Sequence, residues 1–188
     1  MVRRKVSSGV PWALIGGLAA GGAAVISVLP MVKRRAMKVT NILRKDHRLV
    51  SGMIMTLEMT PKINGMMRRS LFSQIRRQLL VHAQAEEDVL YPAVRNMRIG
   101  NAEQLVQDST KEHDNIKRLL QEIDRLDPVT DEFDGKVADL RRTIQHHVED
   151  EEGKVFPMLE RQWTVEQLQQ VGKRLHNRKT DLKRQMAA

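Results

Sequence analysis

Apolar residues recur at steps of three and four positions through most of the chain after residue 36, which is the spacing of one face of an α-helix. The pattern predicts four amphipathic helices, at about 36–58, at 64–94, from 101 to the Asp127-Pro128 break, and from 130 through 158. Pro61 and Pro128 stand between helices, where proline ends a helix. Because short connections make consecutive helices antiparallel, we expect an all-α, up-down-up-down four-helix bundle.

The expected helix starts carry capping signals. Asn101-Ala-Glu-Gln104 resembles a capping box, in which two side chains satisfy free N–H groups of the first turn. Thr130 is expected to cap the fourth helix, and Thr164-Val-Glu-Gln167 to begin a further, short basic helix. Three parts follow: an N-terminal basic and apolar segment (1–35), the bundle (36–161) and a basic amphipathic helix (162–188).

Histidine and glutamate interrupt two of the apolar stripes. His82 and Glu86, like His147 and Glu151, are four residues apart and therefore face the same side of a helix. Their segments are near copies, HAQAEEDVLYP at 82–92 and HVEDEEGKVFP at 147–157. Two acidic-His pairs precede them at a matching offset, Asp46-His47 and Glu112-His113, so the chain is a helical hairpin repeated twice.

Four imidazoles and two carboxylates on inward faces call for a counter-charge, because buried polar and charged groups are costly when they are unpaired. A metal supplies it. The chain has no Cys, and imidazole with carboxylate suits iron, manganese or zinc. Bundle cores hold dinuclear sites, in which two Glu can bridge two ions while the His pairs divide between them.

These motifs, with DHRLV at 46–50 and EHDNI at 112–116, resemble the HHE cation-binding domains of the hemerythrin family over about residues 40–160. The resemblance implies a hemerythrin-like bundle with a non-haem centre of two Fe ions, oxo- or hydroxo-bridged, although Mn or Zn would also suit the donors. The implied metal ligands are His47, His82, Glu86, His113, His147 and Glu151.

The chain departs from the oxygen-carrying hemerythrins at two places. Lys117 stands where those proteins have a further His, and Glu151 and Glu152 follow His147 where they have Asp. With one ligand fewer, both irons keep open positions, which favours redox turnover of O2, NO or peroxide over reversible storage. Whether this makes the protein an enzyme stays open. The alternative is a non-catalytic regulatory module whose iron occupancy controls a partner interaction through the basic C-terminal helix.

Several nearby residues allow a second interpretation. His146 with Asp150 is an alternative ligand pair, although the repeat favours His147 with Glu151. Glu87 and Glu152 are expected to face outward or to make secondary contacts. Tyr91 and Phe156 are expected to be packing residues, and the Met residues of the bundle to fill its core (53, 55, 59, 66, 67 and 97).

Residues 10–32 form an uncharged run between two basic clusters, long enough as a helix to span a bilayer. It predicts an N-terminal apolar helix that anchors the chain, and the larger basic cluster after it places the bundle on the cytoplasmic face of the membrane. Gly17 and Gly21 have the spacing of membrane-helix dimers, so a homodimer through this helix is expected. A surface-lying Gly/Ala segment of a cytoplasmic protein and a cleaved signal peptide are the alternatives.

The net charge of +9 suggests nucleic acid at first, but its distribution argues against that partner. Residues 1–45 hold nine basic and no acidic residues, whereas 46–160 hold 16 basic and 21 acidic ones. We therefore expect no nucleic-acid contact from the bundle. The basic last helix is expected to be a solvated helix packed on the bundle, with anionic lipid headgroups as the alternative contact.

Overall fold

The computed structural model describes residues 37–97 and 101–187, and within these ranges every regular element is helical. The predicted all-α class is confirmed. Five helices are long and four helical pieces are short: α2 (Val39–Met59), α3 (Gly65–Ala85), η1 (Glu86–Leu90), α4 (Tyr91–Arg95), α5 (Ala102–Asp124), α6 (Asp131–Asp150), η2 (Glu151–Val155), α7 (Phe156–Gln162) and α8 (Val165–Gln185).

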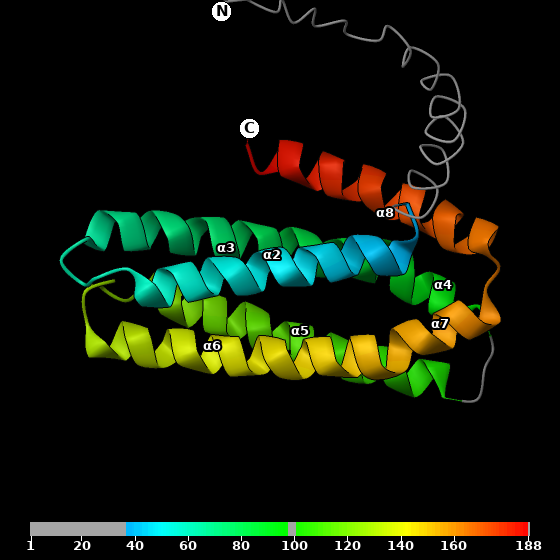
Figure 1. Ribbon diagram of the computed structural model, residues 1–188, viewed down its shortest axis with the longest axis horizontal. Coiled ribbons are helices and arrows are strands. Elements are labelled where there is room, and N and C mark those ends of the chain that lie inside the picture. The colour runs from blue at the N-terminus through cyan, green and yellow to red at the C-terminus, as the bar shows by residue number, and fades with distance from the viewer. Residues whose placement is uncertain (1–36, 98–100, 188) are drawn as a thin grey trace, which may run out of the picture. The chain divides into compact units, whose positions relative to one another are not determined.

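Four of the long helices, α2, α3, α5 and α6, lie alongside one another (Figure 1). Short turns join α2 to α3 and α5 to α6 at the same end, and α4 and α7 continue α3 and α6 at the other end. The fifth long helix, α8, packs against α2, α3 and η1.

Two of the three capping predictions are confirmed, and one is wrong. The Thr130 hydroxyl accepts a hydrogen bond from the Phe133 N–H at 3.3 Å, as expected. Thr164 and Gln167 form a complete capping box at the start of α8. The box expected at Asn101 does not form, because the Asn101 side chain makes no cap hydrogen bond. The last helix is not short, since α8 is as long as α2 and α3.

Two π-helical turns, η1 and η2, interrupt the long helices at the repeated motif. The Tyr91 N–H donates to the Glu86 carbonyl and the Phe156 N–H to that of Glu151, five residues back in both cases. A proline follows each turn, Pro92 and Pro157, and proline both lacks an N–H and crowds the carbonyl four residues earlier. Widening the turn relieves this crowding, and such turns recur at functional sites.

The hydrophobic core consists of two clusters, one on each side of a polar layer. The cluster toward the α2–α3 and α5–α6 turns contains Ile54, Phe72 and Phe133, all at most 1% exposed. The other cluster contains Leu43 and Phe156 and includes the apolar side of α8. Along each helix of the bundle, the layer between the two clusters is where the sequence places histidine and glutamate.

A buried arginine holds the two turns together at one end of the bundle. The Arg68 guanidinium donates to the Thr60 carbonyl at 2.7 Å and to the Pro128 carbonyl at 2.6 Å, and it pairs with Asp134. Arg68 is 3% exposed, so these bonds replace the water that a buried cation loses. One side chain thus links the turn after α2 to the turn before α6.

The expectation that the methionines fill the core is wrong for most of them. Met55, Met59, Met66 and Met67 are exposed, because they lie off the buried stripe of α2 or in the first turn of α3. Met53 and Met97 are partly buried and pack against the core clusters.

The expected single-pass anchor on the cytoplasmic face of a membrane is not supported. Among residues 37–97 and 101–187, no helix combines the length and the apolar character needed to cross a bilayer. Each long helix has charged side chains on its outer face, which a hydrocarbon core would leave unsolvated. The predicted N-terminal apolar helix and its Gly/Ala dimer contact, both assigned to residues 10–32, lie outside the described residues.

Helix α8 approaches the start of α2 so closely that only glycine fits at the crossing. A Cβ atom added to Gly172 would lie 2.0 Å from the Met37 carbonyl oxygen and 2.9 Å from the Val39 nitrogen. Both neighbours are backbone atoms, which cannot move aside alone. Leu168 and Leu175 fill the buried side of α8 around this crossing.

We expect Gly172→Ala to lower the free energy of unfolding by about 1–3 kcal/mol, because the added methyl must push α8 away from α2. Thermal melting by circular dichroism measures the effect. Gly135→Ala is the matched control, since nothing lies within 4 Å of its added Cβ. Alanine in a helix interior should leave that variant as stable or stabilise it by up to about 1 kcal/mol. An unchanged melting temperature for Gly172→Ala would contradict the tight crossing.

Candidate metal centre

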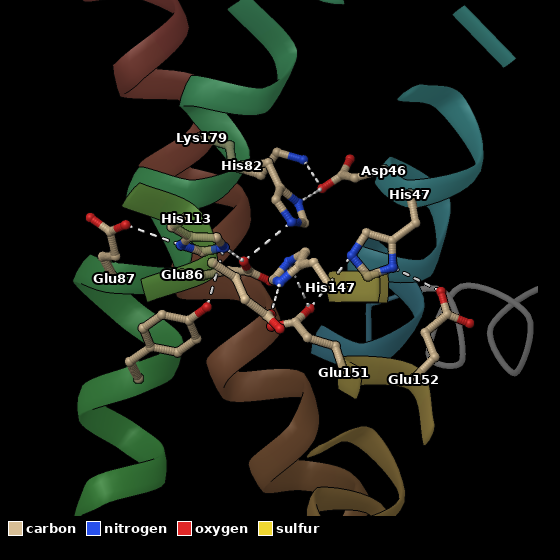
Figure 2. A network of polar contacts seen from close by, with 12 residues as sticks. Asp46, His47, His82, Glu86, Glu87, His113, His147, Glu151, Glu152 and Lys179 are labelled. Atoms are coloured by element: carbon tan, nitrogen blue, oxygen red, sulfur yellow. Dashed lines mark hydrogen bonds and ion pairs between the residues drawn. The ribbon is translucent and has the colours of Figure 1, made fainter. Parts of the chain in front are cut away.

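The polar layer brings together all six side chains that the sequence singles out (Figure 2). Each bundle helix contributes one histidine, and the first residue of each π-helical turn contributes a glutamate. None of the six is more than 5% exposed, so they meet in the interior: His47, His82, Glu86, His113, His147 and Glu151.

The Nε2 atoms of the four histidines point toward the two glutamates. His82 Nε2 lies 3.2 Å and His113 Nε2 3.3 Å from Glu86 Oε2. On the other side, His47 Nε2 lies 3.5 Å and His147 Nε2 3.8 Å from Glu151 Oε2. The layer therefore has two halves, each with one carboxylate and two imidazoles.

Most of these inward atoms have no hydrogen-bond partner among the described residues. They are Nε2 of His47, His82 and His147 and both carboxylate oxygens of Glu86 and Glu151. Buried polar atoms in native proteins are almost always satisfied, and a group left unpaired in the interior costs about 1–3 kcal/mol. Nitrogen and carboxylate oxygen are donors that iron, manganese and zinc accept, so the atoms present fit metal cations.

The donor atoms divide into two overlapping sets of four, each spanning no more than 4.8 Å. One set is His47, His82, His147 and Glu151, and the other is His82, Glu86, His113 and His147. Both sets contain His82 and His147, which lie between the two glutamates. The overlap means that the two sets lie close together, as a dinuclear site requires, with each imidazole nitrogen available to one cation and the carboxylates able to bridge.

The outer nitrogen of each histidine faces a carboxylate from a different helix, so the carboxylates form a ring around the bundle. Figure 2 shows this for His47, His82 and His113. Asp46 of α2 lies 3.5 Å from Nδ1 of His82 on α3, and Glu87 of η1 lies 3.0 Å from Nδ1 of His113 on α5.

Glu112 of α5 and Glu152 of η2 complete this carboxylate ring. Glu112 lies 3.0 Å from Nδ1 of His147 on α6, and Glu152 lies 2.8 Å from Nδ1 of His47 on α2. A carboxylate that accepts the Nδ1 proton fixes the tautomer that leaves Nε2 free for a metal. Three of the four imidazoles are thus oriented by a hydrogen bond, and Asp46 lies 3.5 Å from Nδ1 of the fourth, His82.

Each carboxylate of the ring also has a basic partner farther out. Lys117 lies 2.7 Å from Glu87, the exposed His146 lies 2.9 Å from Glu112, and Arg44 lies 3.8 Å from Glu152. Asp46 pairs with Lys179 of α8. Lys117, at the position where oxygen carriers have a further ligand, therefore supports His113 through Glu87.

Burial and mutual repulsion shift the pKa values of the two central glutamates apart. Burial raises the pKa of Glu86 well above its ordinary range, and the charge of Glu151 raises it further. Burial also raises the pKa of Glu151, but the charge of His147 and the nearby imidazole of His47, whose Nε2 lies 3.5 Å away, outweigh it and leave that pKa below its ordinary value. Without a cation between them, the layer therefore stabilises one carboxylate and one carboxylic acid.

The pKa values of His47 and His82 are also shifted in opposite directions. Burial lowers the pKa of His47, yet the nearby carboxylate of Glu151 raises it overall to about 9. Burial lowers the pKa of His82 to about 4, with the nearby carboxylate of Asp46 opposing this shift and the charge of His47 adding to it. The metal-free layer is therefore neutralised by protons, which cations must displace because they bind neutral imidazole.

Two aromatic rings stack on histidines at corresponding positions of the repeat. Phe156 is nearly parallel to His47, with centroids 5.8 Å apart, and Tyr91 stacks on His113 at 5.5 Å. Both act as packing residues, as expected. Tyr91 differs from its counterpart because its hydroxyl lies 3.3 Å from Nε2 of His113.

The alternative pair of His146 and Asp150 lies at the surface. Together with Glu112 it forms a third group of possible donors, but His146 is exposed and Asp150 pairs with Lys154 at 2.8 Å. The structure therefore places His147, not His146, in the buried layer. The expectation of secondary contacts for Glu87 and Glu152 is confirmed by their bonds to His113 and His47.

Sequence reasoning missed the roles of Asp46, Glu112 and Lys179. Asp46 and Glu112 stand directly before candidate ligands, which was a usable signal, but each one contacts the histidine of another helix. No sequence signal connects Lys179 to Asp46, because 133 positions separate them.

Fold and site define a helical metal-binding protein with histidine and carboxylate donors. The pattern of the hemerythrin HHE cation binding domain matches residues 38–159, so the chain belongs to this family. The resemblance drawn from the sequence is thereby confirmed.

Two known proteins are similar to the chain. A hemerythrin HHE cation binding domain-containing protein from Mycobacterium kansasii has the same fold, with a TM-score of 0.67, 20% identity, and coverage of 77% of this chain and 86% of that one. A DNA nickase from Nostoc sp. is 31% identical over 137 residues, which are 73% of this chain. The chain covers only 38% of the length of the Nostoc protein.

We expect Glu112→Gln to weaken iron(II) binding about 10–100-fold, because the amide accepts the His147 proton less strongly and leaves the imidazole a poorer ligand. Anaerobic titration with a competing chelator measures the affinity. Glu103→Gln removes the same charge from the same helix, but Glu103 is exposed and far along the chain from any candidate ligand. Equal affinities for the two variants would contradict the orienting role of Glu112.

Proposed function

We propose that the chain holds two iron ions in the buried layer and uses them to bind or reduce O2, NO or peroxide. The observation that supports this most strongly is the set of inward donor atoms without partners between four oriented imidazoles. The proposed metal ligands are the six residues predicted from the sequence: His47, His82, Glu86, His113, His147 and Glu151. Manganese or zinc would suit the same donors.

The proposed function of the two iron ions follows from their ligands. Bound iron would supply one-electron redox changes at open coordination positions. The protein's own contribution is to hold Nε2 of each imidazole toward the centre, to exclude bulk water and to offer proton acceptors at the four outer carboxylates. Because Lys117 is engaged with Glu87, no further side chain from that position fills a coordination site.

A small cavity beside the histidines favours a small ligand. About 10 Å³ of space adjoins the histidines, with Val50, Leu79, Ile116 and Ile144 among its lining residues. This is room for about one water-sized molecule, and its walls are apolar apart from the site. O2, NO and peroxide suit such a space, whereas a larger organic substrate would require the helices to separate.

Two further predictions from the sequence belong to this proposal. We propose the up-down-up-down order of the four bundle helices, and the division into residues 1–35, 36–161 and 162–188. In this division the bundle provides the metal chemistry and the last segment, which contains α8, provides a charged surface.

Metal content is the first test. Aerobically purified protein should contain two irons per chain and show near-ultraviolet charge-transfer absorption. The double variant His82→Ala, His147→Ala should lose most of the metal, because both histidines belong to both donor sets. Elemental analysis and the absorption spectrum measure this. His146→Ala is the matched control, since His146 is exposed, and it should retain the metal. Full metal content in the double variant would overturn the proposed site.

Turnover is the second test. The di-iron protein should consume hydrogen peroxide catalytically, and the reduced protein should be oxidised by O2 without forming a long-lived oxygenated species. Stopped-flow absorption follows both reactions. A stable, reversible oxygen adduct would instead favour storage, and an iron-loaded protein inert to O2, NO and peroxide would favour the regulatory alternative.

We propose nucleic acid as the partner for that alternative, in which iron occupancy controls a partner interaction. The Nostoc relative is named a DNA nickase, and α8 combines a basic surface with a direct contact to Asp46. The expected absence of nucleic-acid contact was based on charge counted along the chain, whereas the fold brings basic residues of α2 and α8 to one groove. Nicking itself is not proposed, because most of the Nostoc protein lies outside the match.

A further inference from the structure

A groove runs between α2 and α8, on the outer side of the bundle. It has a volume of about 570 Å³, and its lining includes Lys45 and Arg48 of α2 and Lys179 and Lys183 of α8. Because α8 packs directly on α2, basic residues far apart in the sequence lie on the two walls of one groove.

Three of these cations are uncompensated. Lys45, Arg48 and Lys183 are exposed and form no ion pair with any described residue. Most other basic residues of the bundle, such as Lys62, Lys136 and Arg141, contact carboxylates. Unpaired cations gathered along a groove attract a polyanion, because each can neutralise a phosphate and release a counterion.

The groove favours nucleic acid over a bilayer surface. Cations three and four residues apart on a helix are about 5–6 Å apart, so two walls of such cations can follow a phosphodiester backbone. The groove lining also contains apolar side chains such as Leu49, which is 47% exposed, but a flat bilayer surface would contact only the rim of a groove and would not reach Lys179, which is 8% exposed. Large exposed apolar side chains gather at the α2–α3 turn, where Met59, Ile63 and Met66 are at least 77% exposed.

One wall of the groove connects to the candidate metal centre. Lys179, which is 8% exposed, lines the groove and pairs with Asp46, and Asp46 lies 3.5 Å from Nδ1 of His82. A cation bound at Nε2 of His82 would add positive charge to the ring that Asp46 faces, so the Asp46 carboxylate would be attracted to that ring and would hold Lys179 less tightly. Lys179 then becomes more available to a phosphate in the groove.

We infer that the α2–α8 groove is a phosphodiester-binding site for nucleic acid, and that Lys179 and Asp46 couple its occupancy to metal binding at His82. This inference rests on the proposed regulatory function and specifies its partner surface. By thermodynamic linkage, iron should strengthen nucleic-acid binding and nucleic acid should strengthen iron binding by the same factor.

The groove is tested with the full chain and a fluorescein-labelled DNA duplex of about two helical turns. In fluorescence anisotropy, the double variant Lys45→Glu, Lys183→Glu should bind at least about tenfold more weakly than the unaltered protein and show a reduced salt dependence. The control Arg125→Glu, Arg161→Glu changes the net charge equally at two exposed residues outside the groove lining. It should change the affinity by less than about threefold.

Three outcomes would overturn the groove assignment. They are no DNA binding by the unaltered protein, equal losses in the two double variants, or DNA-independent binding to phosphatidylserine vesicles that the groove variant abolishes. The last outcome would assign the groove to a membrane surface. Stoichiometric iron binding in any of these cases would leave the proposed metal centre standing.

The coupling is tested by comparing DNA affinity with and without iron. Iron should tighten binding by about fivefold or more in the unaltered protein. Lys179→Met should remove this difference, whereas Lys136→Met, which removes a carboxylate-paired cation outside both the groove and the candidate metal centre, should keep it. Equal affinities of the iron-loaded and metal-free unaltered protein would overturn the coupling. If the protein binds no iron, the proposed metal centre fails, and the groove variants still decide the DNA site.

Discussion

The costly burial of ionisable groups in the middle of a narrow bundle determines most of this structure. Four imidazoles and two glutamates lie where only apolar side chains would be stable without counter-charge. The ring of outer carboxylates provides part of this counter-charge, because each one faces Nδ1 of a histidine on the next helix and three of them form a hydrogen bond with it. The inward atoms remain for cations. These contacts form only when the four helices place the residues at the same level along the bundle axis. The ring therefore also fixes how far each helix is shifted along that axis.

Several features beyond the ring serve the same layer. The π-helical turns begin at Glu86 and Glu151, so the helices are locally wider where the two carboxylates enter the core. Two separate apolar clusters, one on each side, provide the burial that offsets a polar layer between them. The contact of Lys179 with Asp46 extends the layer to α8. The last helix is therefore both a cover for the core and a part of the electrostatics of the site.

The candidate ligands could be predicted from the sequence because the signal is local. His82 and Glu86 lie one helical turn apart, and a repeated copy of that turn marks His147 and Glu151. Helix bounds were predictable within a few residues for the same reason. Other predictions from the sequence were wrong. The cap at Asn101 did not form, most methionines lie outside the core, and the membrane anchor found no support among the described helices.

Sequence alone determined which residues form helices and which side of each helix is buried, since periodicity fixes both within a few turns. Only the tertiary structure decided which acid serves which histidine. Asp46 stands next to His47 in the chain yet contacts His82, because side chains of adjacent positions point in different directions from a helix. The grouping of Lys45 and Lys183 into one groove likewise depends on how α8 packs on α2. Contacts between helices depend on how whole helix surfaces pack together. The spacing of residues along one helix face does not specify that packing.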